Sequence, residues 1–474
     1  MNSLKPLHWV GIILGFAVAL FFTYRHLHYF GNISFLGGIL LLEVIIACLW
    51  KYEQRFFVLL IITFSWAGMN LPLASAWNGG RWVVLAAGAV VGFIVWTKTP
   101  RTSTSSLDLI AFFCVCAAFV SAGVSAFVSM ASLKALSLLL LFLYCVSGAR
   151  LAALGREQRF FHGLVWGSEI TVYISAIYYF GLGNSLWGNP NSLGAVMSVA
   201  VFPILLWGWF TSDGPVVKLR RFAALLLCTY LVLFSMARAG MIAMMVVTVV
   251  FCLCLEQYRL LLKVMAAVLV LIATTGMLAP DTLNKSLGDF KDAILYKGHK
   301  EKGVLGSRRT PWERSIATIK EHPLFGTGYG TSPTGEDPGL GFGKFNSSAE
   351  TARENGNSYI NITEWVGLLG VLPFVLLLSV TVMKVWKVCA SMKRTTDARH
   401  YSIPLAMVVL AGLIHANFED WLFAVGYYLS VYFWVCAFLL ADFAPGASVV
   451  QATSLIPRPA RRVPIRFQAV LPNR

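Results

Sequence analysis

Charged residues are scarce in this sequence of 474 residues, because Asp, Glu, Lys and Arg together make up only 13% of it. Soluble globular domains contain about 25%. Hydrophobic residues make up 57%, and they recur in runs of roughly 16 to 22 residues, each long enough to cross the hydrocarbon core of a bilayer as a helix. This composition excludes an ordinary soluble domain and predicts an all-α, polytopic membrane protein.

Signals for disulfide, metal or cofactor chemistry are missing as well. The nine cysteines lie in or beside the hydrophobic runs, and the long polar segment at residues 280–356 contains none. This distribution argues against a disulfide framework and a cysteine-based metal site. The histidines and carboxylates follow no metal-ligand spacing, so we expect neither a metal nor a cofactor.

Two further absences concern the organisation of the chain. No internal repeat supports the inverted halves that are common among secondary transporters. No small-residue cleavage site follows the first hydrophobic run, so we expect an uncleaved first span.

The hydrophobic runs predict about 12 to 14 transmembrane helices. They lie near residues 8–24, 33–50, 56–73, 81–97, 107–122, 132–148, 161–180, 192–212, 222–237, 239–256, 260–279, 357–385, 402–418 and 421–442. Lys and Arg concentrate in alternate connections between these runs, and the positive-inside rule places those connections in the cytoplasm. Both termini then lie inside, and the segment at 280–356 faces outward.

Four regions follow from this topology. Residues 1–279 form an N-terminal transmembrane bundle, 280–356 a large outward loop with short helices, and 357–442 the C-terminal transmembrane helices. Residues 443–474 form a basic, proline-containing cytoplasmic tail, which we expect to be disordered and close to anionic membrane lipid. The formal net charge of +16 reflects this topology, so it predicts no nucleic-acid partner.

Arg238 stands out because the positive-inside rule makes arginine rare on the outward side. It lies in Ser235-Met-Ala-Arg-Ala-Gly240, at a tight outward turn between two predicted helices. One interpretation is an interfacial arginine that reaches the lipid headgroups. The other is a fixed guanidinium facing the bundle interior, whose planar donors suit a phosphate or pyrophosphate.

The outward loop adds a second group of arginines, Arg308, Arg309 and Arg314. Pro311 is followed by Trp312 and begins a helical pattern, which we expect to run along the outer face of the membrane. A solvated cap is the simpler explanation for these charges, since basic and acidic residues nearly balance in the loop.

The helical pattern ends at His322-Pro-Leu-Phe-Gly-Thr-Gly-Tyr-Gly330. Its glycines allow tight backbone turns. The segment lacks the following lysine and the βαβ setting of a phosphate loop, so the glycines alone predict no phosphate site.

A polar cluster leads from the loop into the helix predicted from residue 357. It contains Arg353, Glu354 and Asn357, and such a cluster is costly near lipid unless it lines a polar cavity. An N-cap of the helix is the alternative. Burial at this lip would raise the pKa of Glu354, which makes it the candidate for proton transfer.

Other polar residues are open to structural explanations. Asn191 or Ser192 is a candidate helix cap. Glu169, inside a hydrophobic run, marks either a packed polar contact or a site. His415 lies near Glu419 and Asp420 at an outward helix end, where a structural histidine is the more common finding.

The order of these motifs resembles a known family over roughly residues 185 to 385. The series runs from Asn189-Pro-Asn-Ser-Leu through the Arg238 turn, Arg309 with Trp312 and His322-Pro-Leu-Phe-Gly-Thr-Gly to Asn357-Ser-Tyr and Gly367-Leu-Leu-Gly370. It resembles the bacterial O-antigen ligase and polymerase superfamily. The resemblance implies a GT-C-like glycosyltransferase acting on the outer face of the inner membrane.

The resemblance also implies chemistry and partners. The donor would be a glycan on undecaprenyl pyrophosphate, transferred to a glycan acceptor without a metal ion and with inversion. Arg238 and Arg309 would occupy the family's pyrophosphate-binding positions, with Arg308, Arg314 and Arg353 as further candidates. Our own hypothesis, beyond the resemblance, is that Glu354 deprotonates or orients the acceptor hydroxyl with support from Asn357; a chain-length regulator or flippase is a possible partner.

One departure from the family bears on the activity. Ligases typically begin the helix that ends in GxxG with a His-Asn pair, and the position of that histidine here is Gly356, followed by Asn357. This favours a polymerase of exopolysaccharide, capsule or O-antigen over a ligase to lipid A core. A polysaccharide transporter or flippase, and a non-catalytic scaffold, are the alternatives of other classes.

Overall fold

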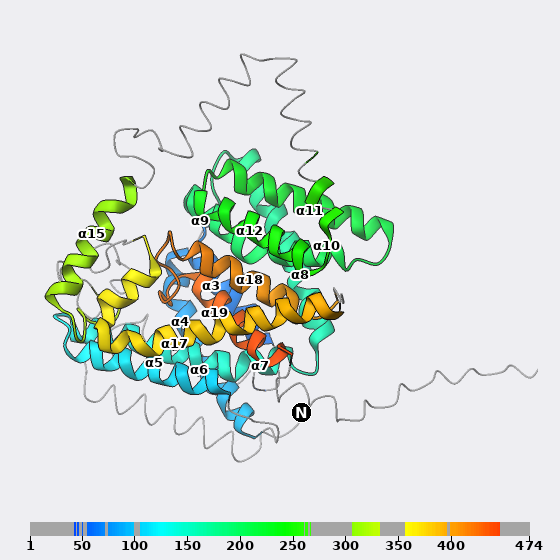
Figure 1. The fold of residues 1–474 in the computed structure, drawn as a ribbon. Coiled ribbons are helices and arrows are strands. Elements are labelled where there is room, and N and C mark those ends of the chain that lie inside the picture. The colour runs from blue at the N-terminus through cyan, green and yellow to red at the C-terminus, as the bar shows by residue number, and fades with distance from the viewer. Residues whose placement is uncertain are drawn as a thin grey trace, which may run out of the picture.

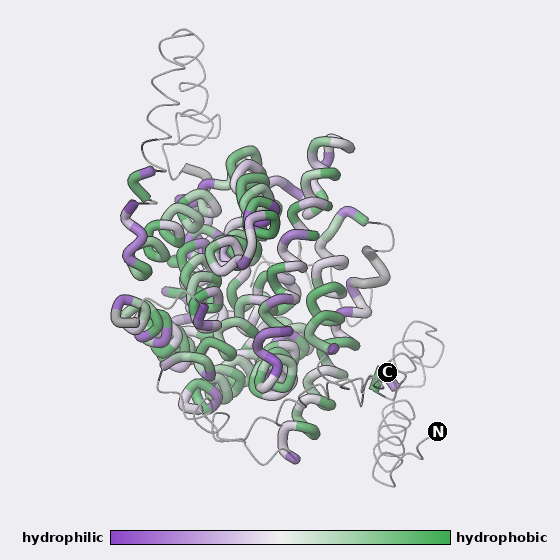
Figure 2. Tube along the Cα trace, turned by 90° about the vertical axis from the view of Figure 1, so that its right-hand side faces the viewer, coloured by the Kyte–Doolittle hydropathy of each residue, from purple (hydrophilic) through white to green (hydrophobic). Residues whose placement is uncertain are grey.

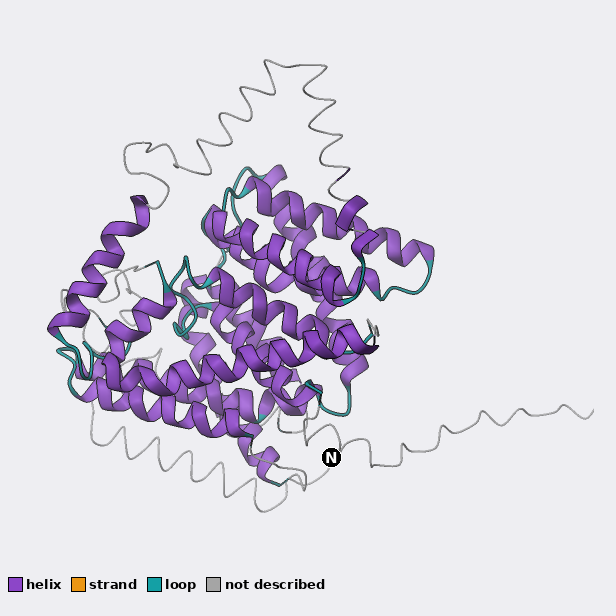
Figure 3. Cartoon of the chain, in the orientation of Figure 1, coloured by secondary structure: helices purple, strands orange, loops and turns teal. Residues whose placement is uncertain are grey.

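The computed structural model describes residues 42–43, 45–46, 50, 55–71, 74–98, 105–259, 261–263, 266, 306–331, 356–395 and 399–445. These residues form helices and loops, without a strand among them (Figure 3). Within these described ranges, five helical stretches are long and apolar enough to cross a membrane, and four shorter apolar helices accompany them. The prediction of an all-α, multi-pass membrane protein is therefore confirmed.

The helices follow one another in chain order. They are α3 (Phe56–Ala67), α4 (Ala74–Thr97), α5 (Ser106–Gly123), α6 (Val128–Val146), α7 (Gly148–Ala153), α8 (Glu157–Ala176), α9 (Pro190–Ala195), α10 (Phe202–Phe210), α11 (Pro215–Phe234), α12 (Arg238–Cys254), α15 (Gly306–Glu321), α17 (Ser358–Thr395), α18 (Ser402–His415) and α19 (Tyr428–Phe443). Two stretches are π-helical. The first, η3 (Ile177–Gly181), extends α8, and the second, η4 (Val196–Val201), joins α9 to α10.

Helices α18 and α19 occupy the centre of the bundle. Figure 1 shows them between α3 to α7 on one side and α8 to α12 on the other. Every residue of α19 is buried, as expected of a helix that is apolar all round. Helix α17 packs along α5 and α18, and α15 packs against α17 at its outer end.

The apolar side chains that remain exposed identify the surface that meets lipid. On α5 and α17 they include Leu109, Phe112, Leu372, Val375 and Trp386. An apolar exterior of this extent is incompatible with water but matches a bilayer, and Figure 2 shows hydrophobic residues along most of the helices.

Several predicted helix boundaries were wrong, and each error has a local cause. The helix expected at 421–442 begins only at Tyr428, because residues 416–427 form a series of turns whose backbone groups bond to neighbouring elements. The helix expected to start at Pro311 begins at Gly306 and contains this proline, which removes only the bond to the carbonyl of residue 307 near the open end of the helix. Asn189, rather than Asn191 or Ser192, caps α9, since its Oδ1 accepts from the N–H of Ser192 at 2.8 Å.

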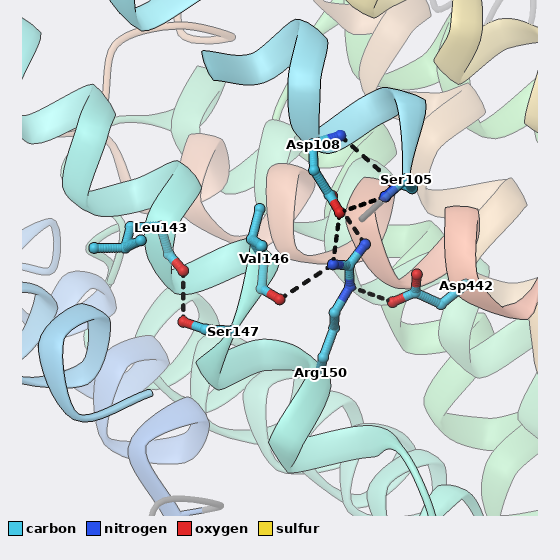
Figure 4. A network of polar contacts seen from close by, with 7 residues as sticks. All are labelled: Ser105, Asp108, Leu143, Val146, Ser147, Arg150 and Asp442. Atoms are coloured by element: carbon cyan, nitrogen blue, oxygen red, sulfur yellow. Dashed lines mark hydrogen bonds and ion pairs between the residues drawn. The ribbon is translucent and has the colours of Figure 1, made fainter. Parts of the chain in front are cut away.

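A buried ion-pair network joins three helix ends on the side predicted to be cytoplasmic (Figure 4). Arg150, fully buried in α7, donates to both carboxylate oxygens of Asp108 at 2.9 Å and to Asp442 at 2.6 Å. Its guanidinium also lies 5.6 Å from the ring centroid of Trp96. The network fastens the start of α5 to the end of α19, so Arg150 has a structural task besides its contribution to the topology.

We predict that Arg150→Met lowers the thermal stability of the detergent-solubilised protein. Removing one partner leaves buried charges uncompensated, which costs about 3–5 kcal/mol. The exposed Arg159→Ala is the matched control. Adding Asp108→Asn and Asp442→Asn to Arg150→Met is expected to recover part of the loss, measured by fluorescence-detected size-exclusion chromatography after heating. No recovery would contradict an electrostatic origin.

Candidate functional site

Helix α17 is interrupted at Gly367, whose backbone adopts φ 69° and ψ 179°. In an uninterrupted helix, the N–H groups of Leu368 and Leu369 would bond to the carbonyls of Glu364 and Trp365. The interruption leaves these four groups without their helical partners, and a membrane supplies no water to replace them.

A loop at residues 322–331, which we call the sealing loop, satisfies all four groups. The N–H groups of Thr327 and Gly328 donate to the carbonyls of residues 364 and 365, each at 3.1 Å. In the other direction, the N–H groups of residues 368 and 369 donate to the carbonyls of Pro323 and Leu324 at 2.7 and 3.2 Å. The loop thereby closes the break in α17 and fixes the end of α15 against the bundle.

Glycine is required at both sides of this contact. A Cβ at Gly326 would lie 2.3 Å from the carbonyl oxygen of Trp365, and a Cβ at Gly367 would lie 2.4 Å from that of Leu324. Both residues also have positive φ, which side chains disfavour. Gly326 and Gly367 therefore allow the close backbone contact between the sealing loop and α17. This contact accounts for both glycines, and no phosphate loop is needed to explain them.

The start of α17 holds the connection between α18 and α19, residues 416–427, in place. Ser358 N–H donates to the carbonyl of Ala416 at 2.9 Å, and its hydroxyl donates to the carbonyl of Glu419 at 2.6 Å. The same hydroxyl accepts from the N–H of Leu422 at 3.1 Å. Further along, Tyr329 of the sealing loop donates to the carbonyl of Phe423 at 2.8 Å.

Asn357 is the N-cap of α17. Its Oδ1 accepts from the N–H groups of Tyr359 and Ile360 at 2.9 and 3.1 Å. Its Nδ2 donates to the carbonyl of Asn417 at 3.0 Å. The cap interpretation weighed for this polar cluster therefore describes what Asn357 does here, and the residue also links α17 to the 416–427 connection.

Arg308 and Glu419 form an ion pair at the outer end of the bundle. Arg308, from the first turn of α15, donates through Nη2 to Glu419 Oε1 at 2.5 Å, and the two side chains are 23% and 29% exposed. The guanidinium lies directly against Gly356, where a Cβ would be 2.0 Å from Nη1. Trp312 Nε1 donates to the carbonyl of the same glycine at 3.4 Å.

Arg238, from a different part of the chain, is within electrostatic reach of Arg308. It is the first residue of α12, and the charge of Arg308 contributes to its surroundings after the larger effect of burial. Two guanidinium groups at this range repel each other, and the repulsion is offset when an anion lies between them. The structure thus places two of the predicted arginines, which are 70 positions apart in the sequence, within electrostatic reach of each other.

The other predicted site residues lie elsewhere. Arg309 is 78% exposed and pairs with Glu313 one helical turn later at 2.8 Å; this hydrogen bond and the charge of Glu313 raise the pKa of Arg309. Arg314 is exposed on the same helix. Arg353 and Glu354 lie outside the described residues.

The remaining polar residues singled out in the sequence have structural partners. Glu169, buried in α8, pairs with Arg220 at 2.9 Å and with Arg221 at 3.4 Å. His415 is buried and its Nδ1 accepts from Trp421 Nε1 at 2.9 Å. Both are packed polar contacts, and no group of potential metal ligands occurs in the part of the chain that the structure describes.

Two cations on the side that is predicted to face outward were overlooked in the sequence. Arg81 donates to the carbonyl of Gly426 at 2.7 Å and lies over the rings of Phe64 and Trp82. Lys134 of α6 donates to the carbonyl of Gly330 in the sealing loop at 2.5 Å. The rule that singled out Arg238, a cation on the outward side of the predicted topology, would have identified both.

Comparison with known families adds to this geometry. Residues 223–375 match the sequence profile of the family described as O-antigen ligase. The match supports the O-antigen ligase and polymerase superfamily for this part of the chain. The match spans Arg238, α15, the sealing loop and the broken start of α17, so the predicted superfamily is confirmed. A search of the curated proteins finds no match.

The sealing loop gives a direct prediction. We expect Gly326→Ala to lower the thermal stability in detergent markedly and to make the chain easier to cleave between α15 and α17, since the new methyl group would displace the loop from Trp365. The matched control is Gly183→Ala, which has a similar φ of +66° but no atom within 4 Å of a Cβ. Equal losses in the two variants would show that backbone strain alone acts.

Proposed function

We propose that this chain is a membrane glycosyltransferase that transfers or polymerises oligosaccharide repeat units carried on undecaprenyl pyrophosphate. It would act on the outer face of the bacterial inner membrane, with both termini in the cytoplasm and a GT-C-like arrangement of its helices. The observation that carries the proposal is that Arg308, held between Glu419 and Gly356, lies within electrostatic reach of Arg238, a cation from a separate element, in a chain whose residues 223–375 match the family described as O-antigen ligase.

The two arginines suit the leaving group of this reaction. An acceptor hydroxyl attacks the anomeric carbon of the donor, the glycosidic bond to phosphate breaks, and undecaprenyl pyrophosphate leaves with the bonding electron pair. Guanidinium groups bind such an anion through paired, charge-assisted hydrogen bonds. Fixed positive charge where negative charge develops lowers the barrier, a task that Arg238 and Arg308 would perform without a metal ion.

The geometry favours Arg308 over Arg309 as the partner of Arg238. Arg308 is largely shielded and fixed by Glu419, whereas Arg309 points to solvent and binds Glu313. A preorganised cation costs less reorganisation during the reaction than a mobile, hydrated one. Arg309, Arg314 and Arg353 then serve at most the outer part of the site.

Glu354 remains our proposed base. It would accept the proton of the acceptor hydroxyl as the new glycosidic bond forms. Asn357, as the cap of α17, would keep this end of the helix in place. The acceptor is proposed to be a growing glycan, since position 356 carries no side chain where the resemblance places the ligase histidine.

Transfer assays test the proposal. Purified protein is incubated with repeat units on undecaprenyl pyrophosphate extracted from cells that lack this gene, and product length and yield are measured on gels. We expect Arg238→Ala and Arg308→Ala each to lower kcat by about 100- to 1,000-fold, the typical cost of removing one donor that stabilises a developing anion. The fall in kcat of Arg309→Ala is expected to be at least tenfold smaller than that of Arg308→Ala. Lys320→Ala, at an exposed position of the same helix, controls for the change in overall charge.

The alternatives predict other outcomes. A larger loss for Arg309→Ala than for Arg308→Ala would contradict the geometric choice. A ligase would attach the glycan to lipid A core without lengthening it. Accumulation of repeat units on the inner leaflet of cells lacking the gene would indicate a flippase, while accumulation on the outer leaflet supports a transferase.

A further inference from the structure

We propose that Glu419 is a positioning residue that orients the guanidinium of Arg308 for the reaction, in a space that Gly356 leaves open. The inference rests on the proposed function, because it assigns a task to Arg308 in transfer. It adds a carboxylate that lies outside the matched residues 223–375 and that comes from the connection between α18 and α19.

Two contacts fix the guanidinium of Arg308. On one side, Nη2 donates to Glu419 Oε1. On the other, Nη1, Cδ and Cζ lie 2.0, 2.9 and 3.0 Å from where a Cβ of residue 356 would be. Any side chain at 356 would therefore have to displace Arg308. The φ of +61° at Gly356 also favours glycine, so both the backbone conformation and the lack of space for a Cβ require glycine at this position.

Glu419 is a firm anchor because its backbone is itself held. Its carbonyl accepts from the hydroxyl of Ser358, which also accepts from the N–H of Leu422. The neighbouring carbonyls of Ala416 and Asn417 bind the N–H of Ser358 and the side chain of Asn357. The N-terminus of α17 thus fixes the position of the Glu419 carboxylate, and this carboxylate fixes the position of the Arg308 guanidinium.

A positioning role of Glu419 and a simple effect of its charge predict opposite kinetic results. The charge of Arg308 reaches both Arg238 and His415, although burial has the larger effect on each of them. Replacing Glu419 by glutamine removes a negative charge beside a proposed anion site, which alone would strengthen binding of a pyrophosphate. Loss of orientation acts in the opposite direction and mainly on the transition state, because displacement of a catalytic group by about 1 Å can cost 100-fold in rate.

The experiment compares Glu419→Gln with wild-type protein in the transfer assay. We expect kcat to fall by about 10- to 100-fold, while the KM for the donor and the affinity for undecaprenyl pyrophosphate stay the same or improve. Glu419→Asp keeps the charge on a shorter side chain, and its kcat is expected to lie between those of Glu419→Gln and the wild-type protein. The matched control is Glu313→Gln, which removes the exposed partner of Arg309 on the same helix and is expected to keep the wild-type kcat.

A double-mutant cycle links the effect to Arg308. If Glu419 acts through Arg308, the variant with both Glu419→Gln and Arg308→Ala is no slower than Arg308→Ala alone. Gly356→Ala, which displaces the guanidinium, is expected to lower kcat as well and to add nothing to Arg308→Ala.

Failure of the inference and failure of the proposed function look different. If Glu419→Gln keeps the wild-type kcat while Arg308→Ala is inactive, the positioning role is overturned and the transferase function stands. The same follows if the losses of kcat in the two single variants add up in the double variant. Wild-type protein that neither transfers repeat units nor binds undecaprenyl pyrophosphate would overturn the proposed function, and the inference with it.

Discussion

Four backbone groups released by the break of α17 at Gly367 set the main constraint on this structure. They lie within an apolar helix, where no solvent replaces lost hydrogen bonds. The sealing loop supplies a partner for each of them, and Ser121 of α5 also donates to the carbonyl of Trp365. Because this loop follows α15 directly, the same four bonds tie α15 to the bundle. The ion pair of Arg308 with Glu419 depends on this arrangement, since it requires the start of α15 to stand beside the start of α17.

The outer end of the bundle is organised around residues 416–427. This connection accepts or donates hydrogen bonds with the start of α17, the sealing loop and Arg81 of α4. Irregular backbone of this kind is tolerated where protein surrounds it and its polar groups are paired. A rigid frame of this sort allows charged groups from distant elements to be held in fixed positions.

Much of the fold could be predicted from the sequence, because apolar length and the distribution of Lys and Arg follow directly from the bilayer. The helix boundaries at 306 and 428 could not, because α15 accommodates Pro311 near its open end and the 416–427 connection is held by hydrogen bonds to other elements. Arg238 was identified from its unusual side of the membrane. The preference for Arg308 over Arg309 was beyond the sequence, because adjacent residues on a helix point in directions about 100° apart and only packing shows which one faces inward. Glu419 appeared as one of several polar residues, and only its contact with Arg308 distinguishes it.

The central claim is that Arg238 and Arg308 bind one pyrophosphate between them. The most direct test is an electron cryomicroscopy structure of the full chain with undecaprenyl pyrophosphate bound. The account predicts that both guanidinium groups contact the pyrophosphate, with Arg308 still beside Gly356. A pyrophosphate that binds away from Arg308, or that contacts Arg309 in its place, would contradict it.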